Sequence, residues 1–122
     1  MKVVIDTDVI IDVLRGFEPT KEKIKELLEN NELVISGITE AEIFAGKDME
    51  IEEKRKKIAK FLSKFKKINP DNRILQIAGE FKRRYRALLL DCVIAATAYV
   101  LNARLFTRNR KDFEKMKEIK LI

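Results

Sequence analysis

One stretch of the sequence decides the fold: LLLDCVIAATA, residues 88–98. Apart from Asp91 it carries no charge, and a helix that is apolar on all sides lies buried rather than on the surface. We therefore expect a buried helix over Asp91 to Leu101. A buried charge costs several kcal/mol unless it is paired or bound to a metal. Asp91 is therefore the first candidate for a functional residue.

In the rest of the sequence, runs of β-branched residues alternate with segments that have helical periodicity. We expect strands at 2–5, 33–36, 104–107 and 119–122, and a short edge strand at 67–69. We expect the other helices at 7–15, 19–30, 39–45, 51–65, 74–85 and 111–116. Such alternation predicts βαβ units, and hence an α/β fold in three layers, with a mainly parallel central sheet and helices on both faces. A length of 122 residues fits one domain over residues 1–122.

Acidic and polar side chains gather where this sheet would place a functional site. In open parallel sheets, ligands bind beyond the carboxyl ends of the strands. The side chains that follow the expected strands or begin the buried helix are Asp6, Asp8, Glu42, Asp91, Asn109 and Asp112. Oxygen ligands of this kind suit Mg²⁺ or Mn²⁺. Such an ion lowers the pKa of a bound water and offsets charge on a phosphate, as metal-assisted phosphodiester cleavage requires.

The composition narrows the chemistry further. The chain contains no histidine, which removes histidine general bases and the Ser-His and Cys-His dyads. Lys and Arg number 26 against 20 Asp and Glu, a formal charge of +6. This excess favours a polyanionic partner such as nucleic acid, although a Lys/Glu-rich surface of a heat-adapted protein would look the same. The single cysteine, Cys92, excludes an internal disulfide and a multi-cysteine zinc site.

Each acidic candidate also has a purely structural explanation. Asp6 and Asp91 could cap the helices that they precede, and Asn109 or Asp112 could cap the short helix behind them. Thr39-Glu40-Ala41-Glu42 fits a capping box. For Asp91 this explanation is the weakest, because apolar residues flank it on both sides.

Four motifs of the chain resemble those of the PIN-domain family. VIDTDVI (4–10) is similar to the opening strand motif, and ITEAEI (38–43) to the second motif, which is centred on a glutamate. DCVIAATA (91–98) is very similar to the third motif, and LFTRN (105–109) with Asp112-Phe113 resembles the fourth. The order, spacing and length agree over essentially the whole chain.

The resemblance implies a PIN-like sandwich and a Mg²⁺- or Mn²⁺-dependent ribonuclease that acts on single-stranded RNA, usually as a homodimer. In short single-domain forms it implies the VapC-type toxin of a toxin–antitoxin pair, which a small antitoxin holds in check. Carried over by position, it assigns the catalytic metal site to Asp6, Glu42 and Asp91. It assigns supporting hydroxyls to Thr7 and Thr107.

The sequence departs from the family pattern at two positions. Asn109 stands at the fourth acidic position, which leaves open whether Asp112 fills that role. Asp8 stands where asparagine or serine is more usual, so an additional carboxylate would adjust the site.

Basic side chains beside the site are candidates for contacts with RNA. Arg108, Arg110 and Lys111 follow the fourth motif directly, and Arg83 and Arg86 lie near Tyr85, which could stack on a base. The lysine runs farther along the chain fit a solvated helix face.

We expect a cytoplasmic protein with no membrane association. Met1-Lys2 leads straight into the first strand rather than into a signal pattern, and no apolar run approaches the roughly 20 residues of a membrane span.

Two other functions remain open at this stage. A non-catalytic PIN-like module could bind nucleic acid or act as a scaffold. A haloacid-dehalogenase-type phosphatase also begins with an apolar strand followed by Asp-x-Asp, which Asp6 and Asp8 match. That fold normally needs a longer chain and a late acidic pair, which residues 106–109 do not supply. A calcium loop through Asp6, Asp8 and Asp12 lacks the glycine and closing glutamate of an EF-hand.

Overall fold

The computed structural model describes all of residues 1–122 and contains a five-stranded parallel sheet. The strands are β1 (Lys2–Ile5), β2 (Glu32–Ser36), β3 (Lys66–Ile68), β4 (Arg104–Phe106) and β5 (Lys120–Leu121), in the order β3-β2-β1-β4-β5. The central strand β1 pairs with β2 and β4, with Val4 opposite both Val34 and Leu105. The chain builds outward from β1 through β2 and β3, and then returns to the other side of β1 for β4 and β5.

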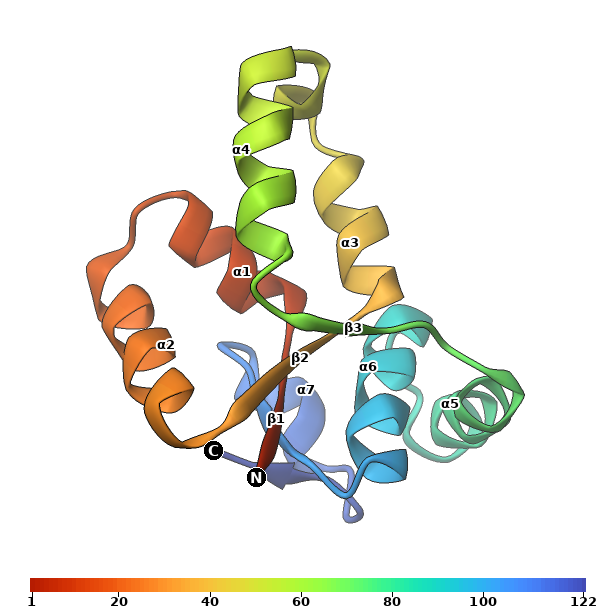
Figure 1. The fold of residues 1–122 in the computed structure, drawn as a ribbon. Coiled ribbons are helices and arrows are strands. Elements are labelled where there is room, and N and C mark those ends of the chain that lie inside the picture. Colours follow the sequence, from red (N-terminus) through yellow and green to blue (C-terminus); the bar gives the residue numbers. More distant parts are fainter.

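Helices cover both faces of the sheet (Figure 1). They are α1 (Thr7–Leu14), α2 (Glu18–Asn30), α3 (Gly37–Phe44), α4 (Glu52–Leu62), α5 (Asn72–Tyr85), α6 (Leu89–Val100) and α7 (Arg110–Glu114), with a 3-10 helix η1 (Lys47–Glu50). Successive strand residues point to opposite faces. Val3 and Ile5 pack with residues of α1 to α4, whereas Val4 packs with residues of α5 to α7. The expected α/β sandwich with a parallel sheet is thus confirmed.

The buried helix is the element that the sequence indicated most strongly, and it is α6. Seven successive residues, Cys92 to Ala98, are buried, and α5 packs along it. The helix begins at Leu89, two residues earlier than expected, with Leu88 as an N-cap that makes no side-chain capping bond. The expectation that Asp91 could cap this helix is therefore wrong, because Asp91 lies within its first turn.

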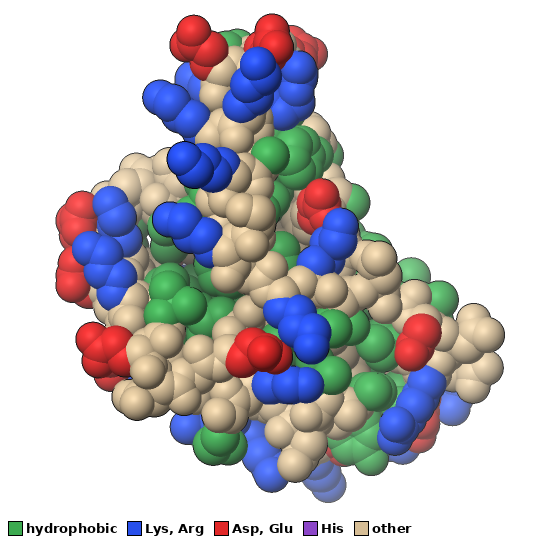
Figure 2. Space-filling view, in the orientation of Figure 1, with side chains coloured by type: hydrophobic (Ala, Val, Ile, Leu, Met, Phe, Trp, Pro, Cys, Tyr) green, Lys and Arg blue, Asp and Glu red, His purple; other side chains and the backbone are tan.

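The sequence patterns missed one feature, an arm formed by α3, η1 and α4 that projects beyond the sheet (Figure 1). The 3-10 helix was not expected, and α4 ends at Leu62 instead of continuing to Phe65. Phe65 lies past the helix end, where it is buried and stacks edge-on against Phe61. Figure 2 shows lysine and arginine side chains along the exposed side of this arm. None of the helices combines the length and the apolarity needed to cross a membrane.

We expect two identical glycine-to-alanine changes to have opposite effects on stability. Gly79 lies inside α5, and a Cβ there would meet nothing within 4 Å. Gly79→Ala should therefore raise the free energy of unfolding by about 0.5 to 1 kcal/mol through the lower entropy of the unfolded chain. Gly16 has equally open surroundings but a φ of +80°, so Gly16→Ala should cost about 1 kcal/mol. Urea unfolding of both variants would test this, and a gain at both positions would contradict the strain assigned to Gly16.

Candidate active site

The candidate site lies where the strand order reverses, between β1 and β4. Ligand sites of open parallel sheets form at this switch point, beyond the carboxyl ends of the strands. Asp6 follows β1 and Thr107 follows β4, so the topology places the two residues side by side although they are 101 residues apart. α3, which begins directly after β2, carries Glu42.

Asp6 is the most deeply buried carboxyl group of the site, with 5% of its surface exposed. Its Oδ1 accepts a hydrogen bond of 2.8 Å from the Thr7 backbone N–H, and its Oδ2 accepts one of 2.7 Å from the Thr107 hydroxyl. Asp6 therefore does cap α1, which is the structural role that the sequence also suggested for it. Burial and the charge of nearby Asp8 nevertheless raise the pKa of Asp6 from 3.8 to about 7, which these two hydrogen bonds only partly oppose. The ionised form of the capping Asp6 side chain is therefore energetically disfavoured in the folded protein.

Thr7 connects Asp6 to Glu42. The Thr7 hydroxyl donates to Glu42 Oε1 at 2.7 Å and also lies 2.9 Å from the hydroxyl of Thr39, which is fully buried. The capping box expected at Thr39 is wrong, because Ser36 caps α3 by accepting from the Ile38 N–H at 3.1 Å. Thr39 instead supports Thr7, a role that sequence patterns could not reveal because the two residues meet only through the fold.

Asp91 reaches the same region from the first turn of α6. Its pKa is raised to about 6, first by burial and then by the charges of Asp112, Glu42 and Asp8. Asp91 therefore lies close enough to each of these three carboxyl groups to be repelled by it. Asp112 lies within α7 and accepts a hydrogen bond from the Asn109 side-chain amide. Asn109 precedes α7 but makes no side-chain capping bond, so its amide orients Asp112 instead.

Asp8 forms the outer edge of the cluster. Its Oδ1 accepts a hydrogen bond of 3.3 Å from the Arg108 backbone N–H, and partial burial raises its pKa. The Thr107 hydroxyl also accepts a 2.9 Å bond from the Asn109 N–H, so the loop after β4 is tied to both aspartates of the first motif. The structure therefore places the candidate acidic and hydroxyl residues at one edge of the sheet, namely Asp6, Thr7, Asp8, Glu42, Asp91, Thr107 and Asp112.

The donor set fits a divalent cation in its chemistry. Carboxylate oxygens are the ligands that Mg²⁺ and Mn²⁺ prefer, and a cation would offset both the burial and the repulsion that raise the pKa values of Asp6 and Asp91. No three acidic side chains converge closely enough to form a ready-made ligand set. The acids are thus gathered at one sheet edge, but they do not already surround a single point.

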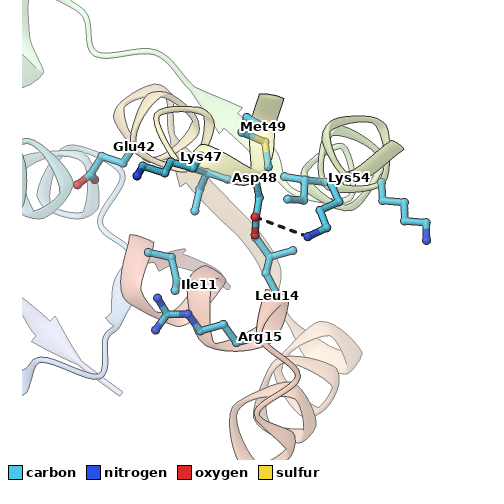
Figure 3. Close-up of a pocket in the computed structure, with 12 residues that line it drawn as sticks. Ile11, Leu14, Arg15, Glu42, Lys47, Asp48, Met49 and Lys54 are labelled. Carbon is cyan, nitrogen blue, oxygen red and sulfur yellow. Dashed lines mark ion pairs between the residues drawn. The ribbon is translucent and has the colours of Figure 1, made fainter. Parts of the chain in front are cut away.

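A hollow of about 630 Å³ extends from the cluster along the arm (Figure 3). Of the clustered acids only Glu42 lines it, and the floor includes Ile11 and Met49. Its charged lining is mainly basic, from Arg15, Lys47, Lys54 and Lys57. Of these, Lys54 is paired with Asp48 at 3.6 Å.

Some of the basic side chains that are candidates for RNA contact are ion-paired within the protein, and others are not. Arg108 is ion-paired with Asp12, and Arg110 lies 3.6 Å from Glu114. The side chains of Lys111, Arg83 and Arg86 are exposed and make no ion pair; nothing joins Arg83 or Arg86 to the carboxyl groups of the site. The hydroxyl of the half-buried Tyr85 is hydrogen-bonded to Glu118, which restrains its ring from stacking on a base.

Comparisons with known proteins agree with this geometry. Residues 3–119 match the family model of the PIN domain. The chain is 31% identical to Ribonuclease VapC10 of Mycobacterium tuberculosis, over 97% of this chain and 90% of that protein. A toxin–antitoxin complex from Klebsiella pneumoniae contains a chain with a TM-score of 0.81 and 30% identity, covering 96% of this chain and 94% of its own length. VapBC-1 from nontypeable Haemophilus influenzae gives a TM-score of 0.82 at 26% identity, over 100% of this chain and 97% of its own.

We expect Asp91→Asn to stabilise the metal-free protein at neutral pH. A carboxyl group whose pKa rises on folding destabilises the folded state once the pH exceeds its unfolded value, here 3.8, and the effect is complete above about 6. Removing this charge should add about 1 kcal/mol, which raises the melting temperature by roughly 3 to 5 °C at this size. In chelator, the variant should therefore melt higher than the wild type at about pH 8 but no higher at about pH 4.

The matched control is Asp48→Asn, since Asp48 is exposed and ion-paired with Lys54, so its loss should not raise the melting temperature. Added Mn²⁺ should stabilise the wild type and have little effect on Asp91→Asn, because a ligand stabilises only by binding the folded state. If Asp91→Asn melts lower in chelator and still responds to Mn²⁺, Asp91 is a structural residue.

Proposed function

The chain belongs to the PIN-domain family, and we propose that it is a metal-dependent ribonuclease that cleaves single-stranded RNA as the toxin of a toxin–antitoxin pair. The observation that carries the proposal is the crowding of Asp6, Glu42 and Asp91 at the switch point of a basic domain without histidine. The 31% identity to a protein named as a ribonuclease supports it. With RNA as its substrate, the protein would act in the cytoplasm.

Within this proposal the side chains of the site have different roles. Asp6, Glu42 and Asp91 would hold a Mg²⁺ or Mn²⁺ ion, which would supply an activated water and offset charge on the scissile phosphate. Thr107 and Thr7 hold Asp6 and Glu42 in place. Asp112 rather than Asn109 serves as the fourth acidic group, because its charge acts on Asp91 and the Asn109 amide orients it.

The alternative functions find less support. A phosphatase of the haloacid-dehalogenase type would need a longer chain and a late acidic pair, which residues 106–109 do not supply. A non-catalytic scaffold would have no use for repelling carboxyl groups, which destabilise a fold that does not use them. None of the comparisons points to either function.

Two protein partners belong to the proposal. The first is an antitoxin, since the similar structures are toxin–antitoxin complexes, and the hollow with its apolar floor and basic rim suits an acidic amphipathic segment. The second is another copy of this chain. Leu88, Leu89 and Leu90 are exposed over 70%, 54% and 42% of their surfaces, and contiguous exposed apolar residues of this kind are typical of an interface.

We expect the purified protein to cut single-stranded RNA with Mg²⁺ or Mn²⁺ and to stop in excess EDTA. Asp6→Asn, Glu42→Gln and Asp91→Asn should each abolish cleavage, because each removes a charged oxygen ligand. The control is Asp71→Asn, since Asp71 only caps α5 through the Ile74 N–H at 2.9 Å and asparagine caps equally well. Gel analysis of a labelled RNA measures this. Cleavage that persists in EDTA, or release of phosphate from small phosphomonoesters without cleavage of RNA, would overturn the proposal.

The free lysine beside the site should bind an RNA phosphate. Lys111→Ala should weaken RNA binding and reduce the dependence of log K on log salt by about 0.7, the value for one lost contact on a single strand. Fluorescence anisotropy with the uncleaving Asp91→Asn protein measures this slope. The control Lys25→Ala removes a charge on α2 that is paired with Glu22 and should leave the slope unchanged. An unchanged slope in Lys111→Ala would direct attention to Arg83 and Arg86.

A further inference from the structure

Arg108 lies beside the candidate site, but its side chain points away from it and into the corner between α1 and α2. Its Nη1 pairs with Asp12 Oδ2 at 2.5 Å and donates to the Thr20 hydroxyl at 3.0 Å. Thr20 is buried and donates in turn to the same Asp12 oxygen at 3.3 Å. The guanidinium carbon also lies 4.9 Å from the centre of the Phe17 ring. The side chain is therefore held on three sides.

The corner is shaped to receive this guanidinium. Asp12 comes from α1, Phe17 from the turn and Thr20 from α2. The left-handed φ of +80° at Gly16 turns the chain back, so that the Phe17 N–H bonds the Asp12 carbonyl at 3.0 Å. Phe17 is 44% exposed, and the guanidinium of Arg108 lies over one face of its ring. We call Asp12, Phe17, Thr20 and Arg108 the corner clamp.

The clamp acts on the loop that completes the site. Arg108 stands between Thr107, which donates to Asp6, and Asn109, which donates to Asp112. Its own backbone N–H donates to Asp8. Three successive residues of this loop therefore touch three different acids, while the one long side chain among them is fixed to α1 and α2. Fixing Arg108 restricts the backbone of its neighbours on both sides.

We propose that Arg108 is a positioning residue: clamped by Asp12, Phe17 and Thr20, it holds the Thr107–Asn109 loop so that Asp6 and Asp112 keep their orientation for RNA cleavage. The inference rests on the proposed nuclease function. It replaces the simpler expectation that Arg108 contacts RNA phosphate, since its guanidinium is already paired with Asp12. Misplacing a catalytic group by about 1 Å can cost about a hundredfold in rate, so a loop of this kind needs an anchor.

The Asp12→Ala variant separates positioning from phosphate binding by the sign of its effect. If Arg108 were a phosphate ligand, removing Asp12 would free its charge, strengthen RNA binding and steepen the salt dependence. If the clamp positions the loop, Asp12→Ala and Arg108→Ala should each lower kcat about tenfold with little change in KM. The double variant should be no slower than either single variant, because the same interaction is lost in all three. Asp12→Asn, which can still accept from Arg108, should recover part of the rate.

The experiment measures kcat and KM of RNA cleavage in Mn²⁺ for these variants, with melting temperatures in chelator to show that each is folded. Glu52→Ala, which breaks the exposed Glu52–Lys56 pair on α4, is the control for loss of a surface ion pair and should keep the wild-type rate. Full activity in Asp12→Ala, or tighter RNA binding by Asp12→Ala in the uncleaving Asp91→Asn background, would overturn the clamp while leaving the nuclease function intact. A wild-type protein that cuts no RNA would overturn both.

Discussion

The structure depends on the burial of one carboxyl group, that of Asp6 at the end of the central strand. An ionised group that is 5% exposed must find hydrogen-bond donors, and it finds them in the first N–H of α1 and in the hydroxyl after β4. These two bonds determine how α1 leaves the sheet and where the loop after β4 begins. Burial itself raises the pKa of Asp6. It also lowers the effective dielectric constant around the carboxyl group, so that the charges of Asp8 and Asp91 raise this pKa further. The geometry of the fold and the chemistry of the site thus have a common origin.

This arrangement sets stability against function. A protein selected for stability alone would replace Asp91, which enters the first turn of an otherwise apolar helix and is repelled by three other acids. Polar contacts limit the conflict without removing it, because Thr7 and Thr107 donate to the carboxylates but carry no positive charge. The guanidinium of Arg108, the residue that follows Thr107, pairs with Asp12 and not with a carboxyl group of the cluster. A divalent cation is the partner that would relieve this repulsion, and so the unrelieved charge is the physical argument for a metal-dependent activity.

The sequence predicted the fold and supplied the candidate residues of the site, but not the contacts that hold these residues in place. Alternating and helical periodicities are local properties, so the strands at Val3 and Leu33 and the apolar helix after Asp91 could be located within a few residues. The placement of Asp6, Glu42 and Asp91 at one edge of the sheet was expected from the rule for parallel sheets together with the family motifs, and their role as a single metal site stays a prediction. Contacts between distant residues carry no local signal. The support of Thr7 by Thr39, the capping of α3 by Ser36 and the capture of Arg108 by Asp12 therefore became apparent only in three dimensions.

The most direct test of this account is the pKa of Asp6, measured from the pH dependence of its carboxyl carbon signal by NMR in metal-free protein. We expect a midpoint of about 7, which should fall when Asp91→Asn removes one repelling charge and fall further when Mg²⁺ is added to the wild type. A midpoint near the ordinary value of 3.8 that neither change moves would show that Asp6 is only the cap of α1, and that the acids do not form one site.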